Sequence, residues 1–197
     1  MISLVGTGDE RMSKVKYKAP KGFGDAMAYL RVGNAAVAID FYAAAFDAKE
    51  RYRLTMGDRI GHAELDFGDT CVMLSDEFSE MGIVGPKALG GTTVTMCLGV
   101  ADADAVVARA VEAGATLKRP VQDEFYGYRT GQVEDPFGHV WMIQTQIEDV
   151  SPKKMQKRLD AMMAQPAAPE ATKPETQKSA QKSAKTSAKS SRRRSKK

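Results

Sequence analysis

Histidine and cysteine are scarce in this sequence: its 197 residues include two of each. Cys71 and Cys97 each lie inside an apolar, strand-like run and are not spaced like metal ligands. We therefore interpret both as small buried hydrophobes rather than as a disulfide or a metal pair. No apolar run reaches the length of a membrane span, and the first residues lack the apolar core of a secretory signal. These absences favour a cytoplasmic protein.

Large apolar residues are missing altogether beyond Gln165. From there on, ten Lys or Arg stand against two acids, a charge of +8, whereas residues 1–164 carry 19 bases and 23 acids. Such a segment cannot bury enough surface to offset its ordering entropy, so we expect residues 165–197 to be a disordered basic tail. The tail either binds nucleic acid or another anionic surface non-specifically or is a solubilising extension without a partner.

Two stretches share one pattern, in which a tight turn leads into a strand. Asp135-Pro136-Phe137-Gly138-His139 leads into the apolar run 140–143, and Phe67-Gly68-Asp69 leads in the same way into 71–74. Pro fixes one backbone angle, and Gly adopts turn conformations that other residues resist. This recurrence indicates an internal duplication.

The surrounding periodicity predicts two modules of the same order, each a strand, a helix and three strands, at residues 26–77 and 92–148. The first should hold strands at 26–32, 49–55, 60–67 and 71–75 and a helix at 35–46 capped by Asn34. The second should hold strands at 92–100, 116–121, 128–134 and 140–146 and a helix at 103–113 capped by Asp102. Residues 1–25 are interpreted as an irregular lead-in in which Met12 is an alternative start, and residues 151–164 as a short helix.

The paired modules, closed by Asp-Pro-Phe-Gly-His, resemble the vicinal oxygen chelate superfamily of glyoxalase I, bleomycin-resistance proteins and extradiol dioxygenases. Ile60 to Leu65, Met73 to Glu77 and Asp135 to Trp141 are similar to its PhnB-like branch. The resemblance covers about residues 26–163. It implies an α+β fold with two tandem βαβββ modules, whose sheets form a cupped, mostly antiparallel, barrel-like surface around a cavity. It indicates the fold more strongly than the function, because one fold hosts many chemistries.

Metal-using members of that superfamily place four ligands on the first and fourth strands of the two modules. The resemblance implies that these positions are Met27, Met73, Thr95 and Met142 here. Thioethers and a neutral hydroxyl do not hold Mn, Ni, Zn or Fe, which need imidazole, carboxylate or thiolate. We therefore expect no metal or other cofactor at the usual site, and a divalent metal only with non-standard ligands. This argues against glyoxalase, epimerase and dioxygenase chemistry, which polarises vicinal oxygens on a metal.

Alternation along 60–67 places His62, Glu64 and Asp66 on one face of a strand. If that face lines the cup, His62 and Glu64 are the candidate catalytic pair, as acid and base, or they hold a polar ligand. If it faces solvent or a neighbouring strand, they form a structural pair. His139, in the turn, is interpreted as structural or exposed, and Trp141 as a core residue.

The same alternation gives the candidate ligand-binding residues of the cup. They are Met27, Tyr29, Arg31, Met73, Thr95, Tyr128, Gln132, Met142 and Gln144. Aromatic rings and an arginine beside a cavity suit a planar or anionic ligand. The aromatic run 125–128 suits packing at a dimer interface equally well.

We predict a homodimer that binds or sequesters a small molecule without a metal, for which the bleomycin-resistance proteins are the precedent in the resembled superfamily. The alternative is an enzyme, either a lyase or isomerase of the lactoylglutathione lyase type that uses His62 and Glu64, or a metalloenzyme with relocated ligands. A third hypothesis is non-specific nucleic-acid binding through the tail.

Overall fold

The computed structural model describes residues 22–24 and 26–164. The predicted lead-in up to Lys21 and the predicted basic tail lie outside the described residues. No helix in the described part of the chain is long and apolar enough to cross a membrane.

The first module forms one four-stranded sheet and one helix. Its elements are β1 (Tyr29–Val32), α1 (Ala35–Phe46), β2 (Lys49–Met56), β3 (Arg59–Phe67) and β4 (Thr70–Asp76). The sheet order is β1-β4-β3-β2, with β1 parallel to β4 and the other pairs antiparallel. Asn34 begins α1 as expected, because its side-chain oxygen accepts a hydrogen bond from the N–H of Val37.

The second module repeats this arrangement. Its elements are β5 (Thr95–Gly99), α3 (Ala103–Glu112), β6 (Thr116–Asp123), β7 (Tyr128–Glu134) and β8 (Val140–Gln146). The sheet order is β5-β8-β7-β6, again with one parallel pair, β5 with β8. A connector with η1 (Ser79–Met81) and α2 (Pro86–Leu89) joins the modules, and α4 (Pro152–Met163) follows β8.

The predicted fold class is confirmed: the chain is α+β, with two tandem βαβββ modules. The strands of the described residues form two separate sheets, which do not close into a barrel. Two strand boundaries were predicted too early, since β1 begins at Tyr29 rather than at residue 26, and β5 at Thr95 rather than at residue 92. Met27 therefore precedes the strand on which it was expected.

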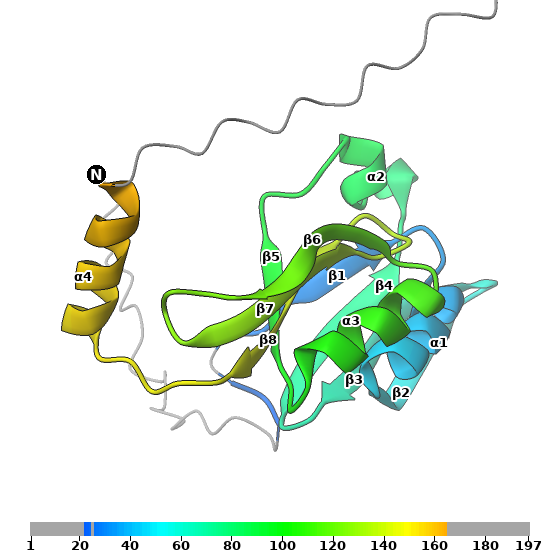
Figure 1. Ribbon diagram of the computed structural model, residues 1–197. Coiled ribbons are helices and arrows are strands. Elements are labelled where there is room, and N and C mark those ends of the chain that lie inside the picture. The colour runs from blue at the N-terminus through cyan, green and yellow to red at the C-terminus, as the bar shows by residue number, and fades with distance from the viewer. Residues whose placement is uncertain (1–21, 25, 165–197) are drawn as a thin grey trace, which may run out of the picture. The chain divides into compact units, whose positions relative to one another are not determined.

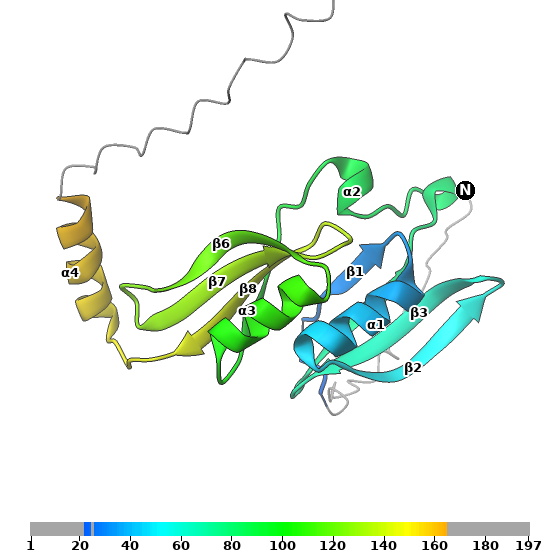
Figure 2. The same ribbon diagram turned by 45° about the vertical axis from the view of Figure 1, so that its right-hand side comes forward.

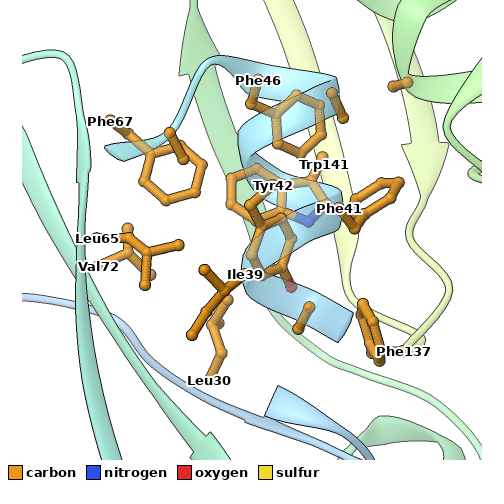
Figure 3. Packing of buried hydrophobic residues seen from close by; sticks show 14 of the residues in the cluster. Leu30, Ile39, Phe41, Tyr42, Phe46, Leu65, Phe67, Val72, Phe137 and Trp141 are labelled. Carbon is orange, nitrogen blue, oxygen red and sulfur yellow. The ribbon is translucent and has the colours of Figure 1, made fainter. Parts of the chain in front are cut away.

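One hydrophobic core joins the two modules. Helices α1 and α3 touch each other and lie on the same side of the two sheets (Figures 1 and 2). At the centre, the rings of Phe67 and Trp141 stack with centroids 5.4 Å apart, and Trp141 lies 4.8 Å from Phe46 of α1 (Figure 3). Trp141 is 1% exposed, so the prediction that it belongs to the core is confirmed.

Asp135, in the turn before β8, is the polar centre of this core and is 3% exposed. One carboxylate oxygen accepts hydrogen bonds from the hydroxyl of Tyr42 at 2.7 Å and from the indole N–H of Trp141 at 2.9 Å. The other accepts from the backbone N–H groups of Phe137 and His139, each at 2.9 Å. Burial, followed by the charge and hydrogen bond of Asp135, raises the pKa of Tyr42 well above its usual value. Through the hydrogen bond between Asp135 and Tyr42, the turn before β8 therefore links the second module to α1 of the first.

Candidate functional site

Each sheet packs one face on the shared core and leaves the other face outside it. In the first sheet the residues opposite the core side include Tyr29, His62, Glu64 and Met73, which we call the first open face. Register brings them together, because Met73 pairs with both Tyr29 and Glu64, while Tyr52 of β2 pairs with Glu64. Alternation along β1, β3 and β4 therefore assembles this face.

The imidazole of His62 is held between two tyrosines. Its Nδ1 lies 2.8 Å from the hydroxyl oxygen of Tyr29, and its Nε2 lies 3.4 Å from both the Tyr52 hydroxyl and Glu64 Oε1. Each ring nitrogen thus has an oxygen partner, and its tautomer decides whether it donates or accepts. The Tyr52 hydroxyl donates to Glu64 Oε1 at 2.5 Å, and that hydrogen bond is the main reason why the pKa of Tyr52 is raised. We call Tyr29, Tyr52, His62 and Glu64 the tyrosine–histidine network.

Glu64 is the buried end of this network and is 8% exposed. Its second oxygen lies 3.7 Å from the guanidinium of Arg51, which also donates to Asp66 at 2.7 Å. A buried carboxylate needs such partners, since its charge is costly to remove from water. The network thus combines a ring nitrogen, two phenols and a charge-compensated carboxylate, groups that can bind a polar ligand or transfer a proton.

Both roles that the sequence allowed for His62 and Glu64 remain compatible with this geometry. The two residues contact each other on the open face, as a ligand site requires, and they contact Tyr52 on the neighbouring strand, as a structural pair requires. Their function therefore stays a prediction.

Tyr52 and Arg51 were missed from the sequence. Alternation along Lys49–Met56 places Tyr52 and Leu54 on the side of His62 and Glu64, and this signal would have found Tyr52. The position of Arg51 could not be predicted from alternation, because the register of β2 shifts between Glu50 and Tyr52.

The second sheet has an open face of its own, with Thr95, Tyr128, Gln132, Met142 and Gln144. Met142 pairs with Cys97 and with Gln132, which brings the expected residues of β5, β7 and β8 together. No hydrogen bond in the described part of the chain joins this face to the tyrosine–histidine network.

Cys97 also lies on the open face of the second sheet and is exposed, so the prediction that both cysteines are buried is right only for Cys71. The error arises because one face of β5 lies outside the core.

The four positions at which the resembled metal enzymes place ligands do not fit a metal. Met73 and Met142 lie on the open faces of β4 and β8, Thr95 begins β5, and Met27 precedes β1. Their thioethers and single hydroxyl are poor donors for a divalent ion. Among residues 22–24 and 26–164, no three or more His, Cys, Asp or Glu side chains gather as a metal site.

Comparisons with known proteins point to one family. Residues 24–143 match the family model described as Glyoxalase/Bleomycin resistance protein/Dioxygenase superfamily. An uncharacterized protein of Mycobacterium bovis is 40% identical over 137 residues, which cover 68% of this chain and 90% of that protein. TioX from Micromonospora sp. ML1 is 28% identical in its crystal structure, with a TM-score of 0.50, over 62% of this chain and 99% of TioX. Protein PA1353 from Pseudomonas aeruginosa shares the fold, with 24% identity and a TM-score of 0.50, over 61% of this chain and 96% of that chain.

Proposed function

Because the chain belongs to the glyoxalase/bleomycin resistance protein/dioxygenase superfamily, we propose that it binds a small molecule on the first open face without the metal that many members use. The observation that carries this proposal is the tyrosine–histidine network, in which the exposed side chains of Tyr29 and Tyr52 contact His62 and the buried Glu64. The donor set at the usual metal positions supports the metal-free part.

The network is held in place before any ligand binds. His62 contacts Tyr29, and Glu64 contacts Tyr52 and Arg51, so the network has hydrogen-bond and ion-pair partners of its own. A site that is ordered in advance loses less conformational entropy on binding. Met73 lies between Tyr29 and Glu64 in the register and adds a flexible apolar contact for the body of a ligand.

A thermal-shift screen of the full chain with small metabolites, antibiotics and divalent metals tests the proposal. A molecule that raises the melting temperature should bind Tyr52→Phe and His62→Ala about 3–10-fold more weakly, because each variant loses about 0.5–1.5 kcal/mol of hydrogen bonding. Tyr126→Phe is the matched control, since it removes a hydroxyl that contacts Thr130 and lies outside the network.

Equal affinity of Tyr52→Phe, His62→Ala and the parent chain for every such molecule would overturn the proposed site. Stoichiometric Ni, Zn, Mn or Fe in the purified protein, lost in His62→Ala, would overturn the metal-free part.

A lyase or isomerase activity is the second candidate function. It is favoured by the 3.4 Å approach of His62 Nε2 to Glu64, since a histidine beside a carboxylate can transfer a proton at neutral pH. Conversion of a bound molecule that is abolished in His62→Ala but retained in Tyr126→Phe would establish this activity. Unchanged bound molecules, recovered from the parent chain, would exclude it for those molecules.

We also propose that the protein is a homodimer. Two large apolar side chains of the edge strand β2 are exposed, Leu54 at 57% and Met56 at 58%, and a second copy would remove this apolar surface from water. The molar mass measured by light scattering tests this, with Leu54→Glu expected to shift the protein towards monomer. A monomeric parent chain at micromolar concentration would contradict the proposal.

A further inference from the structure

A cavity of about 580 Å³ lies where the connector passes β1. Its walls are Tyr29 and Arg31 of β1, His139 of the turn before β8, and connector residues between Val84 and Thr93. Figures 1 and 2 show the connector, which carries α2, beside β1 before it enters β5. The volume is in the range of small-molecule sites. We call this space the connector cavity.

The connector side of this cavity is fixed against β1 by close backbone contact. Gly85 is buried, and a Cβ atom at this position would lie 2.5 Å from the carbonyl oxygen of Arg31. The Gly85 N–H donates to Glu77 at 2.6 Å, and His139 Nε2 donates to that same Arg31 carbonyl at 3.0 Å. The prediction that His139 is structural agrees with this hydrogen bond. The walls therefore come from both modules and are tied to one another.

Arg31 gives the cavity its charge. Its guanidinium lies 3.9 Å above the ring of Tyr29 and donates to the hydroxyl of Ser75. No ion pair joins it to a carboxylate in the described part of the chain, and no Asp or Glu lines the cavity. A guanidinium that is oriented by stacking, and that lacks a counter-ion, is well suited to bind a carboxylate or a phosphate through paired hydrogen bonds.

The rest of the lining is neutral and partly apolar. Thr92 and Thr93 bring hydroxyl groups, while Val84, Pro86 and Leu89 bring hydrocarbon surface. A matching ligand has one anionic group for Arg31 and an apolar body of modest size. Positively charged molecules are disfavoured, because no acidic side chain is present to receive them.

We propose that the connector cavity binds the carboxylate or phosphate end of a small amphipathic molecule, with Arg31 as its counter-ion. The proposal rests on the proposed function and specifies its ligand class. Tyr29 belongs to both sites, since its ring supports Arg31 and its hydroxyl contacts His62. A molecule anchored at Arg31 therefore lies next to the tyrosine–histidine network.

Two dyes with the same ring system test the charge requirement on the full chain. Anilinonaphthalene sulfonate carries an anion, and phenylnaphthylamine is its uncharged counterpart. Arg31→Met and Arg31→Gln should bind the anionic dye about tenfold or more weakly and the neutral dye within about twofold of the parent chain. Arg31→Lys should bind the anionic dye with an affinity between those of the parent chain and Arg31→Met, because it keeps the charge but loses the stacking and the paired hydrogen bonds. Arg53→Met, which removes an exposed arginine paired with Glu50, should change the affinity for neither dye.

Competition then identifies the anion. Displacement of the anionic dye by benzoate or by phenyl phosphate supports the proposal, whereas displacement by neither overturns it. Unchanged binding of the anionic dye to both Arg31→Met and Arg31→Gln, in variants whose circular dichroism is native, would also overturn it. His62→Ala separates this proposal from the proposed function. If this variant loses the ligand found in the screen but still binds the anionic dye in a way that depends on Arg31, the connector cavity binds anions independently of the tyrosine–histidine network.

Discussion

Replacement of Asp135 by alanine tests how strongly the two modules depend on one buried carboxylate. The substitution removes the acceptor for the Tyr42 hydroxyl and the Trp141 indole N–H, and both donors stay buried at 0% and 1% exposure. A buried donor that loses its partner costs about 1–3 kcal/mol, so these two alone cost about 2–6 kcal/mol. Typical domains are stable by about 5–15 kcal/mol, so the variant should lose a large part of its stability.

Two further variants refine the comparison. Asp135→Asn keeps one oxygen for the backbone N–H groups of Phe137 and His139, and its amide can donate to Tyr42 while leaving Trp141 unpaired. We therefore expect it to cost about 1–3 kcal/mol, less than alanine. Asp69→Ala is the matched control, because Asp69 occupies the corresponding turn of the first module and is exposed. It should change stability by less than about 0.5 kcal/mol.

Urea unfolding followed by far-UV circular dichroism measures these differences, provided that the slope of free energy against urea stays constant. Fluorescence of Trp141, the only tryptophan, gives a second probe at the same contact. A loss below about 1 kcal/mol in Asp135→Ala would refute the reasoning, since it would mean that water or a rearranged side chain replaces the carboxylate.

Two other predictions concern the same region. The raised pKa of Tyr42 means that the folded protein keeps the phenol proton at pH values where the unfolded chain loses it. Stability is therefore complete below about pH 10 and falls as the pH rises further. Urea midpoints between about pH 9 and 11 should fall more steeply for the parent chain than for Tyr42→Phe, and parallel curves would contradict this. Gly138→Ala should cost about 1–2 kcal/mol from its φ of 94°, and more than Gly57→Ala, because the added Cβ also meets Pro86 at 3.1 Å whereas Gly57 has open space. Equal losses of stability in Gly138→Ala and Gly57→Ala would show that Pro86 moves away from the added Cβ at no cost in free energy.

Local patterns were sufficient to predict the modules and the face on which His62 lies. The alternation of 60–67 and the caps Asn34 and Asp102 depend on neighbouring residues only, and each is found where it was expected. The sequence predicts the turn that contains Asp135 but not the hydrogen bond that its carboxylate accepts from Tyr42. The turn is evident from Pro136 and Gly138, but the partner on α1 lies 93 positions away along the chain.

Features that depend on contact between distant segments were not accessible from the sequence. Cys97 alternates with Thr95, so the pattern that places Thr95 on the cup side places Cys97 there too; the expectation that Cys97 is buried rested only on its apolar neighbours. The connector cavity depends on the close approach of Gly85 to the carbonyl of Arg31 in β1, and the path of such a loop follows from tertiary contacts. The charge of Arg31 was noted from the sequence, but its lack of a counter-ion was not.

The hydrogen bond between Tyr42 and Asp135 also has a consequence for the order of folding. Synthesis proceeds from the N-terminus, so α1 is complete long before residue 135 is made. Until then the Tyr42 hydroxyl and the surface of α1 that receives Trp141 lack their native partners. The first module therefore gains these contacts only after the second module has been made, and forming them closes a loop between residues 93 positions apart, at a cost in chain entropy.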